Sequence, residues 1–304
     1  MISILIPIYN YVVIDLVKSI HCQSLNISEE YEIILIDDCS QEKYKAQNRE
    51  CALLNNTSYS ELDCNIGRAK IRNKLAKKAQ YPYLLFIDCD AKIDNQSYIQ
   101  NYINECKNHE QIVCGGVKYN ENKIEKDKLL RWKYGREREM KTAEQRNQEP
   151  NKSFTPFNFL ISKELFTNTL FDETITEYGH EDTLFGFLLK QKNITIKHID
   201  NPLIHCGIET NAIFLDKIKE SIQSLVKIYN QNNKEFANEI KLIKVYSFFK
   251  NIKLLWLINL LFTLSRRVSY NILLKCPYLF LLDWYKLGYF TSFSLNFSKG
   301  IQDH

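Results

Sequence analysis

Three continuous apolar runs in the first third of the chain constrain its fold most strongly. They are "ISILIPIY" at 2–9, "YEIILIDDCS" at 31–40 and "YPYLLFIDCD" at 81–90. Runs without regular polar alternation are typical of strands that are buried on both faces of a parallel sheet. Segments with helical apolar spacing, as at 11–23, separate the runs. This rhythm predicts a doubly wound, mainly parallel α/β sheet with flanking helices.

The pattern continues along the chain with weaker signals. We expect a loop and a basic amphipathic helix over 65–80, a helix over 97–108 and a fourth strand over 111–119. The charged segment 121–152 predicts a surface helix and a mobile loop. The stretch "YGHEDTLFGFLLKQKN" at 178–193 predicts a loop that enters an amphipathic helix.

Charge is unevenly distributed along the 304 residues. The whole chain has a formal net charge of +4, whereas nine Lys or Arg and two Asp from Lys241 onward give that segment +7 and leave −3 for the first 240 residues. A basic, apolar C-terminal segment suggests an anionic surface as its partner.

Cysteine usage and the N-terminus indicate a cellular location. Nine cysteines without a CxxC pair fit a reducing cytosol. The opening "MISILIPIYN" lacks a basic n-region and a cleavage site, so it predicts a first strand and not a signal peptide. No stretch reaches about 18 uninterrupted apolar residues, and no transmembrane helix is predicted. We expect a cytoplasmic protein that is peripheral on the cytoplasmic face of the membrane.

The C-terminal segment 248–290 is rich in Leu, Phe, Trp and Tyr. Its apolar blocks at 254–264 and 277–282 are too short to span a bilayer. This composition is typical of interfacial helices, and the alternative is a helical subdomain that packs on the rest of the chain; the two are compatible. Basic residues interrupt the apolar blocks: Lys250, Lys253, Arg266, Arg267 and Lys275.

Polar and acidic residues follow the apolar runs where the predicted strands end. They are Pro7–Asn10, Asp37–Asp38 and Asp88–Asp90. Ligands of doubly wound sheets bind beyond the carboxyl ends of the strands, so we expect these tips to line one crevice. A buried carboxylate needs a cation, hydrogen bonds or solvent, and hard oxygen ligands suit Mg²⁺ or Mn²⁺. The alternative for Asp88 and Asp90 is an ordinary polar turn.

Five short motifs, taken in their order and spacing, resemble an inverting family 2 glycosyltransferase with the GT-A nucleotide-sugar fold. They cover roughly residues 2 to 210, which predicts a catalytic domain over 1–210 and a C-terminal helical extension over 211–304. The motifs are "SILIPIYN" at 3–10, "IILIDDCS" at 33–40, "NIGRAKIRN" at 65–73, "LLFIDCDA" at 84–91 and "YGHEDTLFG" at 178–186.

The resemblance implies a nucleotide site at the first two strand tips. Tyr9, within the motif that also holds Pro7 and Asn10, would stack on the base; the alternative is a core tyrosine at a strand end. Asp38, with Asp37 beside it, would accept hydrogen bonds from the base imide N–H and the ribose hydroxyls. That pairing favours uracil, because cytosine has no such N–H.

The next two motifs complete the implied nucleotide and metal sites. Gly67 would allow close backbone approach, and Arg72 would contact the base or phosphate; the alternative for Arg72 is a solvated helix arginine. Asp88 would lie near the ribose and metal, and Asp90 would ligate Mn²⁺ or Mg²⁺ directly. His205 would be a further metal ligand, or alternatively a structural residue.

The last motif carries the implied catalytic residues. Asp182 would be the general base that takes the proton of the acceptor hydroxyl, and Glu181 would hydrogen-bond the acceptor or sugar. The alternative is an acid pair that the helix macrodipole favours at a helix N-terminus. Asn158 is expected to line the donor-sugar or acceptor pocket.

The implied reaction is metal-dependent and inverting. It moves one sugar from a nucleotide-diphosphate donor, most simply a UDP-linked one, to a hydroxyl of a glycan or lipid-linked glycan. Processive relatives carry a Gln-x-x-Arg-Trp motif after the base, whereas Arg131-Trp132 precedes it here and lacks the glutamine. We therefore expect single-sugar transfer, and no nucleic acid as a partner.

The sequence leaves two alternative functions to compare with sugar transfer. A nucleotidyltransferase shares a similar sheet but carries a Gly-rich, Arg-containing loop after the first strand, and "PIYNYVVIDL" has no glycine. The second alternative is a membrane-associated binding module that has lost catalysis. In such a module we would expect the acidic residues of the motifs to be replaced, yet Asp88, Asp90 and Asp182 are intact.

Overall fold

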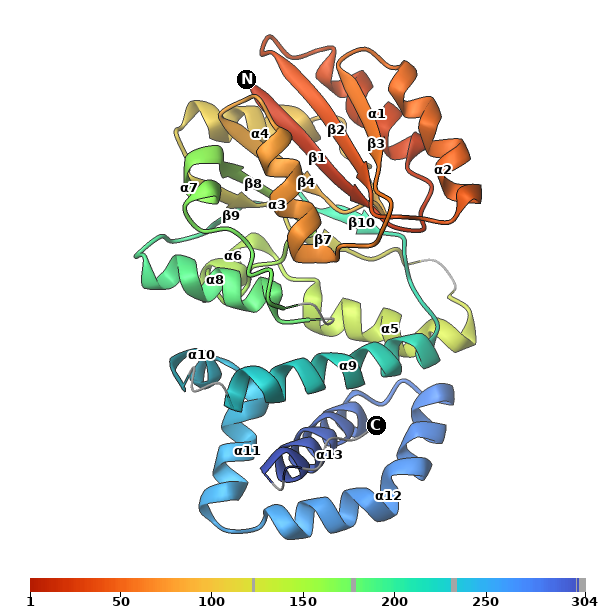
Figure 1. Cartoon of the computed structure of the whole chain (residues 1–304), viewed down its shortest axis with the longest axis vertical. Helices are drawn as coiled ribbons and strands as arrows, with labels where there is room; N and C mark the ends of the chain where they lie inside the picture. Colours follow the sequence, from red (N-terminus) through yellow and green to blue (C-terminus); the bar gives the residue numbers. More distant parts are fainter. Residues whose placement is uncertain (122–123, 176–178, 231–233, 299, 301–304) are drawn as a thin grey trace. The chain divides into compact units, whose positions relative to one another are not determined.

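The protein, seen in a computed structural model (Figure 1), consists of two compact units. The structure describes residues 1–121, 124–175, 179–230, 234–298 and 300. The first unit comprises Met1–Asn120, Glu139–Thr176 and Glu181–Gly207, and the second comprises Glu121–Arg138, Glu177–His180 and Ile208–His304. The predicted domain boundary between residues 210 and 211 stays a prediction.

The first unit is built on a seven-stranded sheet whose strands are β1 (Ile2–Ile8), β2 (Tyr31–Asp37), β3 (Thr57–Glu61), β4 (Tyr83–Ile87), β6 (Ile112–Cys114), β8 (Asn158–Ser162) and β9 (Lys197–His198). Their order is β3-β2-β1-β4-β8-β6-β9. Only β8 runs antiparallel to its neighbours, β4 and β6. The other pairs are parallel. The predicted α/β fold class is therefore confirmed.

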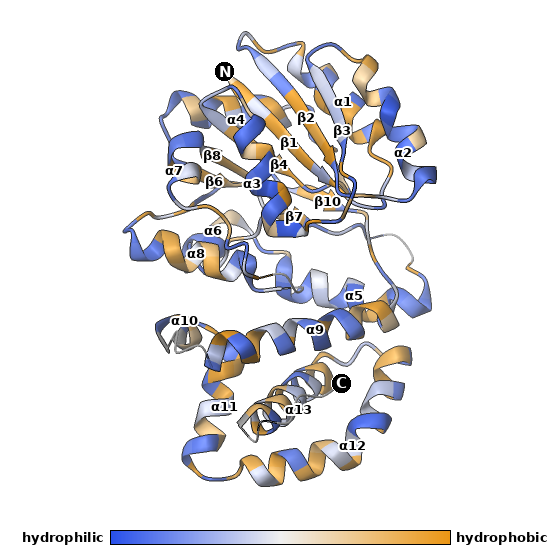
Figure 2. Cartoon of the chain, in the orientation of Figure 1, coloured by the Kyte–Doolittle hydropathy of each residue, from blue (hydrophilic) through white to orange (hydrophobic). Residues whose placement is uncertain are grey.

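Helices flank this sheet (Figure 1). In β1, Ile4, Leu5 and Ile6 are all fully buried. Because successive strand residues point to opposite faces, both faces of β1 are covered, which explains its unbroken apolar run (Figure 2). The helical segments of the first unit are α1 (Ile14–Ser24), α2 (Glu42–Asn48), η1 (Arg49–Leu53), α3 (Arg68–Lys78), α4 (Tyr98–Lys107), α6 (Ala143–Asn147), α7 (Lys163–Thr167) and α8 (Glu181–Gln191).

The parallel register places the carboxyl ends of three strands at the same end of the sheet. Ile2 of β1 pairs with Tyr31 of β2 and with Tyr83 of β4, so the three strands start level with one another. The β4 pairing of β1 ends at Leu5, before Pro7, which has no amide proton to donate. Asp38, Asp88 and the residues after Ile8 therefore follow neighbouring strands at the same end of the sheet.

The predicted fourth strand over 111–119 is wrong as a single element. The chain leaves the main sheet after β6, and residues Val117–Lys118 form β7 in a second sheet with β10 (Leu203–His205) and β5 (Ala91–Lys92). The break falls at Gly115-Gly116, where Gly116 has a φ of 90° that ends the extended conformation. This small sheet positions His205, because β10 pairs His205 with Ala91, the residue after Asp90.

The charged segment 121–152 is more ordered than predicted. After residues 122–123, which are not described, it contains η2 (Lys126–Lys128), α5 (Leu129–Tyr134), the π-helical η3 (Gly135–Glu139) and α6. Arg146 of α6 is buried and donates to the carbonyl of Ile199 at 2.7 Å and to Nδ1 of His198 at 3.1 Å. Burial lowers the pKa of His198 to about 4, so its ring is neutral near pH 7.

The second unit forms its own helical core, in agreement with the predicted C-terminal helical extension. Leu130 of α5 packs into this core together with Phe214, Phe262, Leu282 and Phe290. Its C-terminal helices are α9 (Asn211–Asn230), α10 (Lys234–Glu239), α11 (Lys241–Asn251), α12 (Leu255–Lys275) and α13 (Leu279–Ser298).

No single helix among the described residues has the length and apolarity of a bilayer span. The pair α11 and α12, which meet at a 118° bend, reaches both criteria only when the two helices are combined.

Candidate active site

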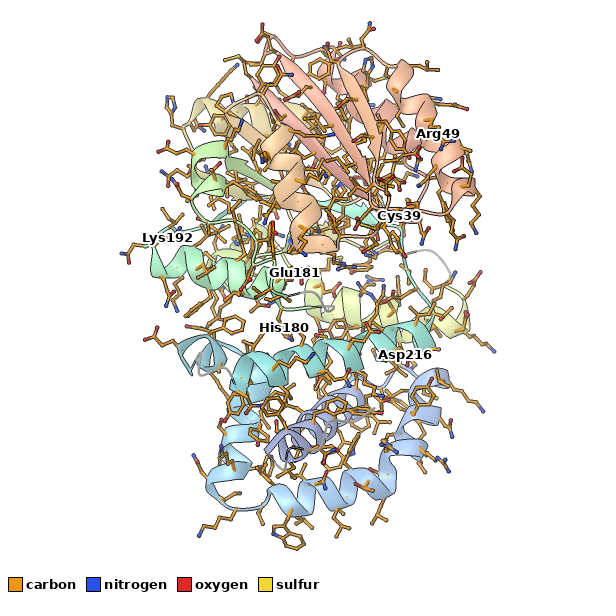
Figure 3. All side chains as sticks on the ribbon, in the orientation of Figure 1. Cys39, Arg49, His180, Glu181, Lys192 and Asp216 are labelled. Carbon is orange, nitrogen blue, oxygen red and sulfur yellow. The ribbon has the colours of Figure 1, made fainter. Side chains whose placement is uncertain are left out.

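Arg72 joins two acidic segments that are far apart in the sequence. It lies on α3 with only 3% of its side chain exposed, and its Nη2 donates to Asp88 Oδ1 at 2.7 Å. Its Nη1 lies 3.9 Å from Glu181 Oε1 at the start of α8 (Figure 3), and the guanidinium stacks over the Phe171 ring. Arg72 therefore holds the tip of β4 against the first turn of α8.

This burial bears on both sequence interpretations of Arg72. It is not a solvated helix arginine, and its enclosed guanidinium, already paired with Asp88, does not support the predicted contact with a base or phosphate. A buried guanidinium requires carboxylate partners because an uncompensated charge in the interior is strongly unfavourable. The acids are thus also part of the framework.

Asp90 and His205 form a carboxylate–imidazole pair close to Asp88. His205 Nε2 lies 3.4 Å from Asp90 Oδ2, and the His205 ring stacks on Tyr119 and packs against Phe157. A Cβ on Gly207 would lie 2.3 Å from Asp90 Oδ2, so only glycine allows this approach of the chain to the carboxylate. Burial raises the pKa of Asp90, an effect that His205 counteracts and the charge of Asp88 reinforces.

The donor set fits a divalent cation that is completed by phosphate oxygens. Among the described residues there is no ready-made cage of three or more His, Cys, Asp or Glu side chains. A carboxylate and an imidazole 3.4 Å apart instead provide two ligands, and a cation there would compensate the charge of the half-buried Asp90. Mg²⁺ in enzymes is commonly held by one or two carboxylates plus substrate phosphates.

Glu181 and Asp182 occupy the first turn of α8. Asp182 Oδ1 accepts the backbone N–H of Thr183 at 2.6 Å and its hydroxyl at 3.1 Å. Burial raises the pKa of both acids, and the charge of Asp182 raises that of Glu181 further. Carboxyl groups with raised pKa in a polar cluster are typical of proton-transfer sites. Tyr178, which belongs to the same motif, lies outside the described residues.

Arg68, which the sequence analysis did not single out, is exposed at the first position of α3. Its charge lowers the pKa of Asp90, of Glu181 and of Asp182. Asp90 and the Glu181–Asp182 pair therefore lie within electrostatic reach of Arg68. The signal was present in the motif at 65–73, where a basic residue directly follows the glycine.

Asp38 organises the loop that leads into α3. Its Oδ1 accepts the N–H of Ile66 at 2.7 Å, and its Oδ2 accepts the N–H of Gly67 at 3.0 Å. Gly67 has a φ of 86°, a left-handed conformation that favours glycine, and it precedes the first helical residue, Arg68. Burial raises the pKa of Asp38, and the two amide hydrogen bonds counteract this effect. Each carboxylate oxygen keeps a lone pair for a further donor.

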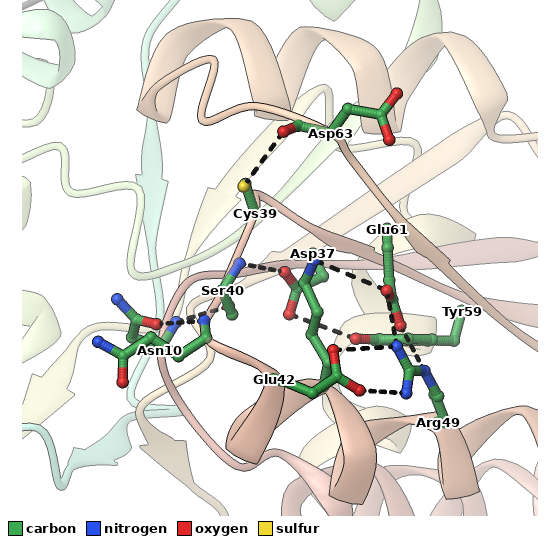
Figure 4. Close-up of polar contacts among 11 residues, drawn as sticks. Asn10, Asp37, Cys39, Ser40, Glu42, Arg49, Tyr59, Glu61 and Asp63 are labelled. Carbon is green, nitrogen blue, oxygen red and sulfur yellow. Dashed lines mark hydrogen bonds and ion pairs between the residues drawn. The ribbon is translucent and has the colours of Figure 1, made fainter.

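Asp37 and Asn10 have structural partners (Figure 4). Asp37 is fully buried, and its oxygens accept the N–H of Ser40 at 2.7 Å and the hydroxyl of Tyr59 at 3.3 Å. Asn10 Oδ1 accepts the N–H of Gln41 at 2.9 Å, which joins the tips of β1 and β2. For Asp37 this geometry does not support a contact with the ribose.

Tyr9 is 54% exposed at the tip of β1. The alternative of a core tyrosine is therefore excluded. Burial raises the pKa of the neighbouring Cys89 thiol to about 12, against a hydrogen bond from the backbone of Tyr9. This contact links the tips of β1 and β4.

Tyr11 lies close to Cys206 and Asp90, although its sequence pattern did not single it out. Burial first, and then the charges of Cys206 and Asp90, raise the pKa of Tyr11 to about 12.

Asn158 does not line a pocket as predicted. It is fully buried at the start of β8, and its Oδ1 accepts the hydroxyls of Tyr98 at 2.6 Å and Tyr102 at 2.7 Å. Its Nδ2 donates to the carbonyls of Asn201 at 2.9 Å and Gly116 at 3.1 Å. The amide group is therefore saturated and fixes the two sheets together, because a buried amide must satisfy all its hydrogen bonds.

Solved structures resemble this architecture over nearly the whole chain. The crystal structure of S. aureus TarS 1–349 has a TM-score of 0.54 at 17% identity and covers 98% of this chain and 91% of that one. The mannosyltransferase PcManGT from Pyrobaculum calidifontis, in complex with GDP-Man and Mn²⁺, has a TM-score of 0.58 at 12% identity, covering 99% and 88%. These likenesses show that the chain shares the fold of these two proteins.

The sequence comparison identifies the family. The profile of Glycosyl transferase family 2 matches residues 3–170, and the chain belongs to that family of glycosyltransferases. Escherichia coli chondroitin synthase is 25% identical over 236 residues, which cover 67% of this chain and 34% of the relative. The chain thus spans about a third of the length of that relative.

The first testable prediction concerns Arg72. We expect Arg72→Met to lower the free energy of unfolding by about 3 kcal/mol, because it leaves Asp88 and Glu181 partly buried without their cation. Lys74→Met, at an exposed position of the same helix, is the control and should change it by less than about 0.5 kcal/mol. Equal stability of the two variants, measured by urea denaturation, would contradict this role.

Proposed function

We propose that the chain transfers one sugar from a nucleotide-diphosphate donor, UDP-linked, to a hydroxyl of a glycan or lipid-linked glycan with inversion. The observation that carries this proposal is the Arg72 bridge, which brings Asp88 within reach of the α8 acids. A transferase of this type needs a base and a diphosphate site close together, and the Arg72 bridge supports that arrangement.

The nucleotide site is assigned to the first two strand tips. The exposed ring of Tyr9 stacks on the base, and Asp38 uses its remaining lone pairs for the imide N–H of uracil. UDP and UDP-GlcNAc are bound in structures of S. aureus TarS, whose 17–18% identity to this chain supports the fold alone. The choice of uracil therefore rests on Asp38.

The diphosphate site is assigned to Asp90, His205 and Arg68. Asp90 and His205 would hold Mn²⁺ or Mg²⁺, which as a Lewis acid stabilises the departing diphosphate. Arg68, exposed and close to both acid pairs, neutralises the same charge from the N-terminus of α3. Asp88 is kept in place by Arg72 and faces the ribose.

Asp182 acts as the general base. It accepts the proton of the acceptor hydroxyl while that oxygen forms its bond to the anomeric carbon. The bond between the anomeric carbon and the diphosphate oxygen breaks at the same time, and the diphosphate leaves with the electron pair. One displacement inverts the configuration. Glu181, held near Arg72, hydrogen-bonds the acceptor.

The second prediction tests the base. Asp182→Asn should reduce kcat/KM by about 10²–10⁴-fold, because a positioned base contributes that much. In the wild type, burial raises the pKa of Asp182, so kcat/KM should rise with pH at higher pH values than an exposed aspartate would give. Asp216→Asn, on the surface of α9, is the control. Full activity of Asp182→Asn with a confirmed donor and acceptor would exclude this mechanism.

The Asp182→Asn variant should lose activity but gain stability. A carboxyl group whose pKa is higher in the folded state binds protons more tightly there, so the free energy of unfolding falls as pH rises through that pKa. Asp182→Asn should therefore melt at a higher temperature than wild type at pH 7 without ligands, and the difference should shrink as pH is lowered. A lower melting temperature at pH 7 would show that the carboxylate is a structural requirement.

The third prediction distinguishes the residue that binds the metal from the residue that binds the diphosphate. UDP with Mn²⁺ should raise the melting temperature more than UDP alone or CDP with Mn²⁺; saturation at 100 times Kd corresponds to about 2.7 kcal/mol. Asp90→Asn should remove the Mn²⁺-dependent increment, and Arg68→Gln should weaken UDP binding with little change in stability. Wild-type responses from both variants would refute the assigned diphosphate site, and an equal response to CDP would refute the choice of uracil.

A further inference from the structure

Helix α12 exposes a row of large apolar side chains among polar and basic ones. Five apolar residues at intervals of four form this row, and Trp256 and Leu264 are 63% and 72% exposed. A surface helix normally presents polar residues to solvent, and a continuous exposed apolar surface marks an interaction site. We call these five residues the α12 stripe: Trp256, Leu260, Leu264, Val268 and Ile272.

The opposite side of α12 is already occupied. Ile258, Phe262 and Leu273 are buried in the core of the second unit, where Phe262 packs edge-on against Tyr285 and Tyr289. Figure 1 shows α11 and α12 running around α13 within this unit. The α12 stripe is therefore not needed to close the core of its own unit.

The charged residues of α12 itself are all basic. Arg267 follows Leu264 by three residues and Lys275 follows Ile272 by three, so each lies on the exposed side next to the stripe. No acidic residue occurs in α12, and between Lys241 and Ser298 the sequence has eight Lys or Arg and one acid, Asp283. Asp283 is paired with Arg138 at 2.9 Å.

The exposed side of α11 continues this composition. Lys241, Lys244, Val245 and Phe248 of α11, and Ile252 directly after the helix, are exposed. Apolar side chains alternate there with lysines, again without an acid. The two helices thus present the same chemistry on both sides of their 118° bend.

We infer that the α12 stripe docks on an anionic lipid surface, with α12 lying in the plane of the interface. A helix with Trp and Leu toward the lipid and basic residues beside them has the composition of such interfacial helices. A second copy of this chain fits less well, because two facing α12 helices would bring Arg267 and Lys275 against like charges without an acid to pair them. The inference is independent of the proposed sugar transfer.

The experiment is co-sedimentation of the full chain with phosphatidylcholine vesicles that contain or lack phosphatidylserine. We expect binding to the anionic vesicles that weakens with salt. Trp256→Gln with Leu264→Gln should weaken it at least tenfold, and Arg267→Gln with Lys275→Gln about fivefold per charge, which corresponds to ~1 kcal/mol each. Melting temperature and UDP binding should stay at wild-type values, because these side chains lie outside both cores.

Matched controls lie in the first unit. Leu53→Gln replaces a leucine that is 84% exposed, and Lys18→Gln replaces an exposed lysine; neither should change vesicle binding. Equal binding of neutral and anionic vesicles, or wild-type binding by the stripe variant, would overturn the inference. So would a dimer in light scattering that the stripe variant converts to a monomer without any vesicle binding by the wild type.

Discussion

The buried guanidinium of Arg72 is the interaction on which the site depends. A positive charge with 3% exposure needs carboxylate partners, and here they come from the tip of β4 and from the first turn of α8. Asp90 follows Asp88 by two residues and Asp182 follows Glu181 directly, so the ion pairs of Arg72 join two acidic segments of the chain. The same cation offsets part of the repulsion that gathering them creates.

The N-terminus of α3, one turn before Arg72, is fixed by a second buried carboxylate. Asp38 accepts two consecutive amides, Ile66 and Gly67, and so ties the loop before α3 to the tip of β2. Arg68 then stands at the start of the helix and Arg72 one turn later. One helix thus supplies an enclosed arginine that stabilises the acids and a second arginine whose side chain is exposed.

The sequence predicts the parts of the molecule that local pattern determines. The runs of β1, β2 and β4 are apolar throughout because both faces are buried, and the positions of Asp88 and Asp90 follow from them. In contrast, β3 is the polar "TSYSE" at a sheet edge, and 111–119 divides between two sheets, so neither could be predicted from periodicity. The burial of Asn158 depends on Tyr98, Tyr102 and Asn201, and the enclosure of Arg72 depends on Glu181; these partners are distant in sequence and meet only in the folded chain.

Burial raises the pKa values of Asp90, Glu181 and Asp182, and a cation beside Asp90 would favour its charged form. The proposed function supplies this cation together with a diphosphate. The most direct test is anomalous diffraction from Mn²⁺ in crystals grown with UDP. We expect one strong peak within coordination distance of the Asp90 carboxylate and the His205 imidazole, with the diphosphate oxygens as its other ligands. A UDP-bound structure with its Mn²⁺ peak elsewhere, or with the diphosphate remote from Asp90, would contradict it.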